Sequence, residues 1–355
     1  MTTKQLDDMQ NDCALSVGED VNRLFPLRNA NLLVTGGTGF VGSWLAEMAA
    51  FLNDCHGFKI NLCLLAPRAS DFRSRAPHLA SRRDIELIES DVRSLIEVPR
   101  ETNWIIHAAG SPDNRFHFSH PVKTFETIVV GTHSLLNAAS RLSALQKVLC
   151  LSSGLVYGPQ RWEDVAVAED AFTALDCNNF ANLYAESKRA AETITTAYRS
   201  QYGVPVLNAR LFAFIGPYQL LDRPWAINNF LRVALRVGPI RLLGSGETVR
   251  SYLYGSDLAF WLLSILVSGN IGGAYNVGSP MGISLKDLAT KIADDAPRRP
   301  RIELNTLPSA KVSNTRWLPD VSLAQKQCSL EVRVPLDQAI RRTVNWHAER
   351  ILQPQ

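Results

Sequence analysis

Two side chains with the type and spacing for acid–base chemistry are Tyr184 and Lys188. They are four residues apart on a predicted helix, so they share one helix face. A free tyrosine has a pKa of about 10, too high for a base at neutral pH, but a nearby ammonium group lowers it. Ser153 ends a predicted strand and could hydrogen-bond the same substrate oxygen. Because Tyr-x-x-x-Lys pairs are common on helix surfaces, this interpretation depends on the elements that surround the pair.

A glycine-rich turn lies upstream of these residues. Residues 32–34 predict a short buried strand, and apolar residues recur at helical intervals over 40–52. Between them, Gly36, Gly39 and Gly42 follow at three-residue spacing. A strand, a glycine-rich turn and a helix N-terminus form an anion site, because free backbone N–H groups and the helix dipole face the ligand. We therefore favour a dinucleotide pyrophosphate site over a turn that binds nothing.

Strands and helices alternate along the first part of the chain. Further strands are predicted at 60–65, 85–88, 104–106 and 147–151, and a helix at 123–141. This alternation predicts an α/β fold with a doubly wound parallel sheet. Ligands of such sheets bind outside the carboxyl ends of the strands. The residues predicted to lie there are Gly36, Asp91, Ala108 and Ser153.

The end of the second predicted strand bears on the choice of cofactor. A fold that binds NAD usually carries Asp or Glu there for the adenosine ribose, whereas this chain has Ala66, Pro67 and Arg68. A guanidinium at Arg68 can hold the 2′-phosphate of NADP. The alternative is that these arginines form a solvated basic loop. For Arg68 we give the two interpretations equal weight. We favour the solvated loop for Arg73, Arg75, Arg82 and Arg83. The sequence thus predicts NAD or NADP, leaning to NADP.

Composition narrows the classes of partner. The chain has 355 residues, of which 46% are hydrophobic and 20% charged. Its formal net charge of +3 is too small to argue for nucleic acid or a membrane surface. The longest apolar stretch, 258–267, is too short to span a bilayer. Six scattered cysteines show no metal spacing. We therefore expect no metal site and a reduced, cytoplasmic setting.

Residues 1–30 precede the first strand and form an N-terminal extension without a basic-then-apolar signal pattern. Leu24, Phe25 and Leu27 are expected to dock on the main body. The acidic part before them is expected to be poorly ordered.

Several longer motifs occur in a fixed order: Thr35–Gly42, Asp91-Val92, His107–Gly110, Ser152–Gly158, Tyr184–Lys188, Arg210-Leu-Phe, Gly216-Pro217, Arg250–Asp257, Tyr275–Gly278 and Arg342–Trp346. With these motifs the sequence resembles the extended short-chain dehydrogenase/reductase family, specifically its nucleotide-sugar epimerase/dehydratase branch. The resemblance implies a Rossmann domain at 31–210 and a smaller α/β substrate domain, mainly 211–350. It also implies a nucleoside-diphosphate sugar in the cleft between the domains and a possible homodimer.

The resemblance further implies roles for single residues. The catalytic trio would be Ser153, Tyr184 and Lys188. Tyr184 and Lys188 would also hold the cofactor. The other residues that would hold it are Gly36, Gly39, Phe40, Val41, Gly42, Arg68, Asp91, Val92, Ala108 and Ala109. Asn229 and Arg250 would hold the diphosphate of the sugar nucleotide, which suits a guanidinium that can bind two phosphate oxygens. The alternatives are a surface ion pair for Arg250 and a helix cap or surface amide for Asn229.

One departure from the family pattern bears on the reaction. Sugar 4,6-dehydratases carry an acidic pair at the positions of Gly154 and Leu155, and UDP-glucuronate decarboxylases carry a glutamate at the second. Elimination of water needs an acid and a base near C5 and C6 of the sugar. Neither residue supplies one, although residues 111–132 resemble the decarboxylase branch.

We therefore interpret the chain as an NAD(P)-dependent enzyme acting at C4 of a nucleotide-linked hexose, either a 4-keto reductase or a 4-epimerase. One alternative is a decarboxylase or 4,6-dehydratase that uses other acids, from among Glu163, Asp164, Glu169 and Asp170. An alternative of another class is a non-catalytic dinucleotide-binding scaffold or sensor. The complete catalytic trio argues against the scaffold, which has no physical need for all three residues.

Overall fold

The computed structural model describes residues 1–236, 238–305 and 315–352. Its centre is a seven-stranded parallel sheet in the order β11-β6-β5-β4-β1-β2-β3. The strands are β1 Asn31–Thr35, β2 Asn61–Ala66, β3 Ile85–Glu89, β4 Trp104–His107, β5 Lys147–Ser153, β6 Val206–Leu211 and β11 Ala274–Val277. The order reverses between β1 and β4, which creates the switch point at which such sheets bind ligands. The predicted strands and the doubly wound parallel sheet are confirmed.

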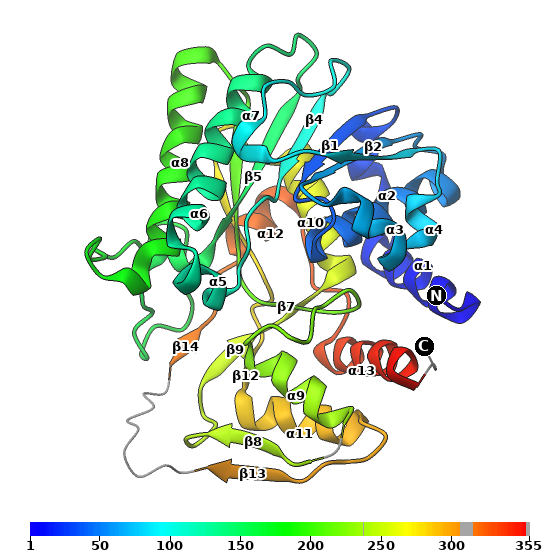
Figure 1. The fold of residues 1–355 in the computed structure, drawn as a ribbon, viewed down its shortest axis with the longest axis vertical. Helices are drawn as coiled ribbons and strands as arrows, with labels where there is room; N and C mark the ends of the chain where they lie inside the picture. The colour runs from blue at the N-terminus through cyan, green and yellow to red at the C-terminus, as the bar shows by residue number, and fades with distance from the viewer. Residues whose placement is uncertain (237, 306–314, 353–355) are drawn as a thin grey trace.

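Alternating side chains along the strands separate two cores. Leu32 and Val34 face one core, while Leu33 between them faces the other. The first core packs against α2 Phe40–His56 and α10 Gly255–Ser268. The second packs against α7 Gly131–Ala139 and α8 Leu183–Tyr202. The sheet is therefore covered on both faces (Figure 1).

The helix predicted at 123–141 is observed as an uninterrupted helical run over 121–139 with three consecutive parts. They are α6 Pro121–Phe125, a π-helical segment Glu126–Val130 and α7 Gly131–Ala139. At Gly131 a Cβ would lie 2.7 Å from the Val92 side chain, so the helix passes very close to the end of β3. The π turn inserts one extra residue where this approach occurs.

Below the sheet in Figure 1 lies a smaller lobe of short strands and helices. Its pairs are β7 Phe214–Ile215 with β10 Leu253–Tyr254, and β8 Ile240–Leu243 with β13 Ile302–Asn305. A third sheet joins β9 Val249–Ser251 to β12 Gly282–Ser284 and β14 Arg316–Trp317. The helices are α9 Ala226–Ala234, α11 Leu285–Asp295 and α13 Leu336–Leu352. Because β11 and α10 return to the large sheet, the large lobe uses residues on both sides of the predicted boundary at 210.

The remaining short helices connect these parts of the fold. They are α3 Phe72–Arg75, α4 Pro77–Ala80, α5 Asn114–Ser119 and α12 Ser322–Cys328, with 3-10 turns at Asp20–Leu27, Ala69–Asp71, Val92–Ser94, Gly154–Tyr157 and Phe180–Asn182. No helix in the described ranges is long and apolar enough to cross a membrane.

The N-terminal extension is ordered, so the expectation of a poorly ordered acidic part is wrong. Residues Thr3–Val17 form α1, which begins with a capping box and packs on α2 and α10. Met9, Cys13 and Val17 recur every fourth residue and are buried, which makes one apolar stripe. Leu24 and Leu27 are buried as predicted, whereas Phe25 is 40% exposed.

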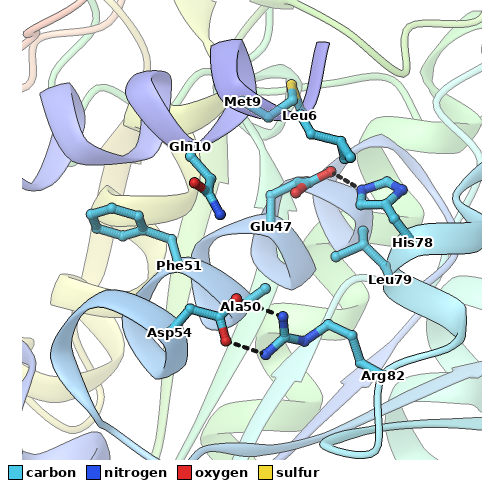
Figure 2. A pocket seen from close by; sticks show the side chains of 10 residues that line it. All are labelled: Leu6, Met9, Gln10, Glu47, Ala50, Phe51, Asp54, His78, Leu79 and Arg82. Atoms are coloured by element: carbon cyan, nitrogen blue, oxygen red, sulfur yellow. Dashed lines mark hydrogen bonds and ion pairs between the residues drawn. The ribbon is translucent and has the colours of Figure 1, made fainter. Parts of the chain in front are cut away.

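Between α1, α2 and α4 lies a pocket of about 190 Å³, shown in Figure 2. The charged side chains that line it are paired with one another. Glu47 accepts a hydrogen bond from His78 Nε2 over 2.8 Å, and Arg82 binds Asp54 over 2.7 Å. The pocket is thus a gap under α1 whose charged side chains already have partners within the protein.

Candidate functional site

The glycine-rich turn joins β1 to α2 under tight steric limits. Gly36 has a φ of 66°, and a Cβ there would lie 2.6 Å from the Ala108 carbonyl oxygen. At Gly42 a Cβ would lie 2.1 Å from the carbonyl oxygen of Gly37. Gly39 is the N-cap of α2 and supplies no side chain to the first helical amides. These amides therefore face the switch point of the sheet, where the residues fit a dinucleotide pyrophosphate.

Other residues predicted to hold the cofactor lie after the carboxyl ends of β3 and β4. Asp91 caps a 3-10 turn by accepting the amide of Arg93, and its carboxylate pairs with that guanidinium over 2.6 Å. This pairing holds the pKa of Asp91 below its usual range. Ala108 and Ala109 follow β4 directly beside the glycine turn. The structure brings the turn and these strand ends to one edge of the sheet.

Ser153, Tyr184 and Lys188 are brought together by β5 and α8. Ser153 is the last residue of β5, and its Oγ accepts the Leu155 amide over 3.2 Å. A hydrogen bond also joins the Ser153 and Tyr184 side chains. Lys188 lies one helical turn after Tyr184, with Nζ 5.9 Å from the phenol centroid. Its ammonium donates to the Leu151 carbonyl over 2.7 Å, so the lysine is tied to β5.

Burial is the main cause of the pKa shifts of Tyr184 and Lys188. It raises the pKa of Tyr184 to about 12, against the opposing hydrogen bond from Ser153. It lowers the pKa of Lys188 to about 8. The lowering of the Tyr184 pKa expected from the Lys188 ammonium is not found in this structure, because burial of the phenol is the largest influence on that pKa and raises it. At neutral pH Tyr184 therefore holds a proton that it can donate.

His107 lies beside the trio but is structural, as its surroundings show. Nδ1 is 2.6 Å from Thr35 Oγ1, and Nε2 is 3.1 Å from Thr132 Oγ1. Thr132 donates its own proton to the Ile128 carbonyl, so it accepts from Nε2–H and the Thr35 hydroxyl donates to Nδ1. Burial lowers the pKa of His107 to about 3, which leaves it neutral.

Two of the arginines near the glycine turn have surroundings that differ from those expected from the sequence. The Arg68 side chain is 84% exposed and lies 3.6 Å from Asp71, so it is available at the edge of the site. Arg75 is half-buried and donates to the Thr38 carbonyl in the glycine turn. Arg82 pairs with Asp54 and Asp84. The favoured interpretation of Arg75 and Arg82 as solvated is therefore wrong, because each is held by a partner distant in sequence, Thr38 for Arg75 and Asp54 for Arg82.

Asn229 and Arg250 both belong to the small lobe. Asn229 lies inside α9, not at its N-cap, and its Oδ1 accepts from Arg232 over 2.9 Å. Arg250 is on β9 and donates to the Val249 carbonyl and to both oxygens of Thr315. Among the described residues its hydrogen-bond partners are neutral, and no ion pair is found for it there. Nothing in these contacts tests the predicted diphosphate role.

The positions that carry acids in dehydratases are closed or apolar. A Cβ on Gly154 would lie 2.8 Å from the Phe212 ring, and Leu155 is 48% exposed. Of the other acids considered for elimination, Asp164 pairs with Arg161 over 2.8 Å, and Glu169 accepts the amide of Asn276 over 2.9 Å. Glu163 and Asp170 are exposed in the same loop.

One residue near Tyr184 was not indicated by any motif. The His117 imidazole, from α5, stacks on the Tyr184 phenol with ring centroids 4.5 Å apart and planes 11° apart. Asp113, the N-cap of α5, binds Arg223 of the small lobe over 2.6 Å. No spacing in the sequence relates residue 117 to residue 184, because their contact depends on how the loop after β4 folds.

Known proteins share this sequence pattern and fold. The family model described as NAD dependent epimerase/dehydratase family matches residues 32–278. UDP-glucuronic acid decarboxylase 1 of Arabidopsis thaliana is 30% identical over 334 residues, which cover 92% of this chain and 71% of that protein. The decarboxylase 1 of Danio rerio is 29% identical, with 90% and 73% covered.

Solved structures agree on the fold. WbmF of Bordetella bronchiseptica in complex with NAD+ has a TM-score of 0.74 at 23% identity, covering 92% of this chain and 94% of that one. DesIV, a dTDP-glucose 4,6-dehydratase of Streptomyces venezuelae with NAD and TYD bound, has a TM-score of 0.76 at 23% identity, covering 90% and 97%. The chain therefore belongs to the NAD dependent epimerase/dehydratase family, within the extended short-chain dehydrogenase/reductases, and its large lobe has their Rossmann-type fold.

Proposed function

We propose that this protein transfers a hydride at C4 of a nucleoside-diphosphate hexose, as a 4-keto reductase or a 4-epimerase. The observation that carries the proposal is the Ser153–Tyr184 hydrogen bond beside Lys188, at the carboxyl end of β5 and near the glycine turn. This arrangement can hold one sugar oxygen and move one proton.

The proposed step uses the protonated state of Tyr184. A bound nicotinamide dinucleotide supplies or accepts the hydride. In reduction, Tyr184 donates its proton to the C4 oxygen while C4 gains the hydride, so a ketone becomes a secondary alcohol. Ser153 donates to the same oxygen and polarises it. Lys188, with a pKa of about 8, stays charged at neutral pH and stabilises the phenolate that remains. In an epimerase the same step runs in both directions, with the keto sugar turning over in between.

Elimination of water fits the site less well. It requires removal of the C5 proton and loss of the C6 hydroxyl, each with a positioned proton-transfer group that typically contributes about 10²–10⁴-fold. Gly154 carries no side chain, and a larger residue there would require the Phe212 ring to shift; Leu155 offers only carbon. Glu186, close in sequence to Tyr184, pairs with Arg189 over 3.4 Å. We expect no 4-keto-6-deoxy product.

Decarboxylation is the second candidate, and the UDP-glucuronic acid decarboxylases among the relatives favour it. Oxidation at C4 of a nucleotide-linked glucuronate places a ketone β to the C6 carboxylate. Loss of CO2 from such a β-keto acid leaves an enolate, which the Ser153 and Tyr184 hydroxyls could stabilise. This route demands fewer additional acids than dehydration does.

We further propose that the cofactor is NAD or NADP, with a lean to NADP. The exposed Arg68 and the absence of an acid at residues 66–68 support this preference. Structural neighbours were solved with NAD+ or NADH bound, which supports the dinucleotide itself. Asn229 and Arg250 are proposed to hold the substrate diphosphate.

The test is a substrate screen on purified protein. UDP-, dTDP-, GDP- and CDP-hexoses, their 4-keto forms and UDP-glucuronate are each incubated with NADH or NADPH, or with the oxidised cofactors. Mass spectrometry and NMR follow the sugar. We expect reduction of a 4-keto sugar or exchange of C4 epimers. Release of CO2 with a UDP-pentose would instead establish the decarboxylase, and loss of water at normal rates would refute the elimination argument.

A further inference from the structure

A ring stack joins His117, on the short helix α5, to the catalytic candidate Tyr184. The two rings lie 4.5 Å apart and only 11° from parallel. His117 is 8% exposed, so the imidazole is part of the site wall and not a surface group. A flat group thus covers one face of the phenol.

The imidazole is itself held in place. Nε2 lies 2.7 Å from the Ser111 carbonyl oxygen, and because a carbonyl can only accept, Nε2 carries the proton. Burial lowers the pKa of His117, so the ring is neutral at neutral pH. Its helix starts at Asp113, which is 3% exposed and binds Arg115 and Arg223. The start of α5 is therefore anchored to the small lobe, and the imidazole is bonded to the residues just before that helix.

The groups around the phenol come from three elements. Ser153 from β5 hydrogen-bonds the hydroxyl, Lys188 from α8 places its ammonium 5.9 Å from the ring centroid, and His117 from α5 covers a face. We propose, on the basis of the proposed function, that His117 is a positioning residue: its neutral ring fixes the plane of the Tyr184 phenol so that the hydroxyl stays directed at Ser153 and the C4 oxygen. A proton donor must stay within hydrogen-bond reach of its target, so a freely rocking phenol would lose rate.

This role requires a flat ring and no charge at position 117. His117→Phe keeps a flat ring and gives up the hydrogen bond to Ser111. His117→Ala frees the phenol and admits water to its face. His117→Leu fills the space without a flat ring and covers the case in which the alanine variant unfolds. The matched control is His120→Ala, at an exposed histidine just after the same helix.

The first readout needs no substrate. Tyrosines are replaced by 3-fluorotyrosine, and the fluorine resonance of Tyr184 is assigned among eight by its loss in Tyr184→Phe. We expect both His117→Ala and His117→Leu to shift this resonance, because both remove the stacked flat ring. We expect only His117→Ala to lower its titration midpoint, by about one pH unit, because partial loss of burial favours the phenolate. His117→Phe and His120→Ala are expected to keep the wild-type midpoint. An unchanged resonance in His117→Ala would overturn the proposal.

The second readout uses whichever nucleotide sugar the substrate screen identifies. We expect kcat to fall about tenfold in His117→Ala with KM within twofold, and His117→Phe to recover most of it. If His117→Phe is as slow as His117→Ala, orientation by a flat ring is wrong. If no sugar is turned over, the proposed function fails, while the fluorine experiment still decides whether His117 orients Tyr184.

Discussion

At the scale of residues, the site is set by burial more than by direct charge contacts. Burial of Tyr184 and Lys188 moves their pKa values apart, from 10.0 and 10.5 to about 12 and about 8. Both groups remain protonated at neutral pH, which suits a proton donor next to a cation. The chemistry thus depends on a desolvated pair tied to β5 through Ser153 and Leu151.

Tyr184→Phe should fold normally, bind cofactor and lose turnover. Removing one hydroxyl leaves the ring stack in place but removes the proton donor, so we expect kcat to fall about 10²–10⁴-fold. Cofactor affinity by fluorescence and kcat on the identified sugar check this. Tyr202→Phe, an exposed tyrosine at the end of the same helix, is the control. Activity within a few-fold of wild type would remove Tyr184 from the mechanism.

Arg68→Ala should weaken NADPH binding and leave NADH binding nearly unchanged. The guanidinium is exposed at the end of β2, where the 2′-phosphate of NADP would lie, and only NADPH carries that phosphate. Dissociation constants for both cofactors are compared in wild type, Arg68→Ala and the exposed control Arg73→Ala. Tighter binding of NADH than NADPH to wild type would show that the NADP preference is wrong.

At the scale of elements, α1 is a structural part of the large lobe. It lies over α2 and α10, and Lys4 reaches α13 by an ion pair with Glu349 over 3.3 Å. In addition, Asp12 accepts a hydrogen bond from Tyr254 over 2.5 Å and pairs with Arg342. The helix therefore connects the large lobe to the last helix of the chain.

Met9→Ala should lower the free energy of unfolding by about 2 kcal/mol, the low end for such a core truncation. The low end is expected because Met9 already borders the pocket under α1. Urea unfolding of wild type and variant measures the change. Asp8→Ala, on the exposed face of α1, should stay within about 0.5 kcal/mol. An equally small effect for Met9→Ala would mean that α1 contributes little to stability.

At the scale of the whole molecule, buried titratable groups couple stability to pH. Burial lowers the pKa of His107 to about 3 and of His347 to about 4. Between these values and 6.5 the unfolded chain binds more protons, so acid lowers stability. Asp12 acts in the opposite direction, because burial raises its pKa to about 6 and the folded state then binds the extra proton.

The contribution of His107 can be isolated. Its pKa is depressed in the folded state, so the stability it contributes is present near pH 7 and is lost as the pH falls below 6.5. For one proton, the free energy of unfolding changes by at most about 1.4 kcal/mol per pH unit. Urea unfolding between pH 7 and 4.5 should show a slope smaller by about this amount in His107→Gln than in wild type. An equal slope in His107→Gln and wild type would show that this linkage is wrong.

The sequence by itself determined the features that depend on neighbours along the chain. Alternation and helical periodicity predicted the strands of the parallel sheet, and the glycine spacing of residues 36–42 predicted the turn before α2. The four-residue spacing of Tyr184 and Lys188 predicted their shared helix face, since helix geometry is local. These elements account for the fold and for the framework of the site.

Only the tertiary structure decided the features that depend on partners distant in sequence. It buried one face of α1, a segment whose acidic composition had indicated poor order. It tied Glu169 to Asn276, placed Arg75 at the glycine turn and stacked His117 on Tyr184. It also raised the Tyr184 pKa, because desolvation depends on the packing of several elements around one ring. Such contacts leave no spacing pattern along the chain, which is why sequence reasoning did not find them.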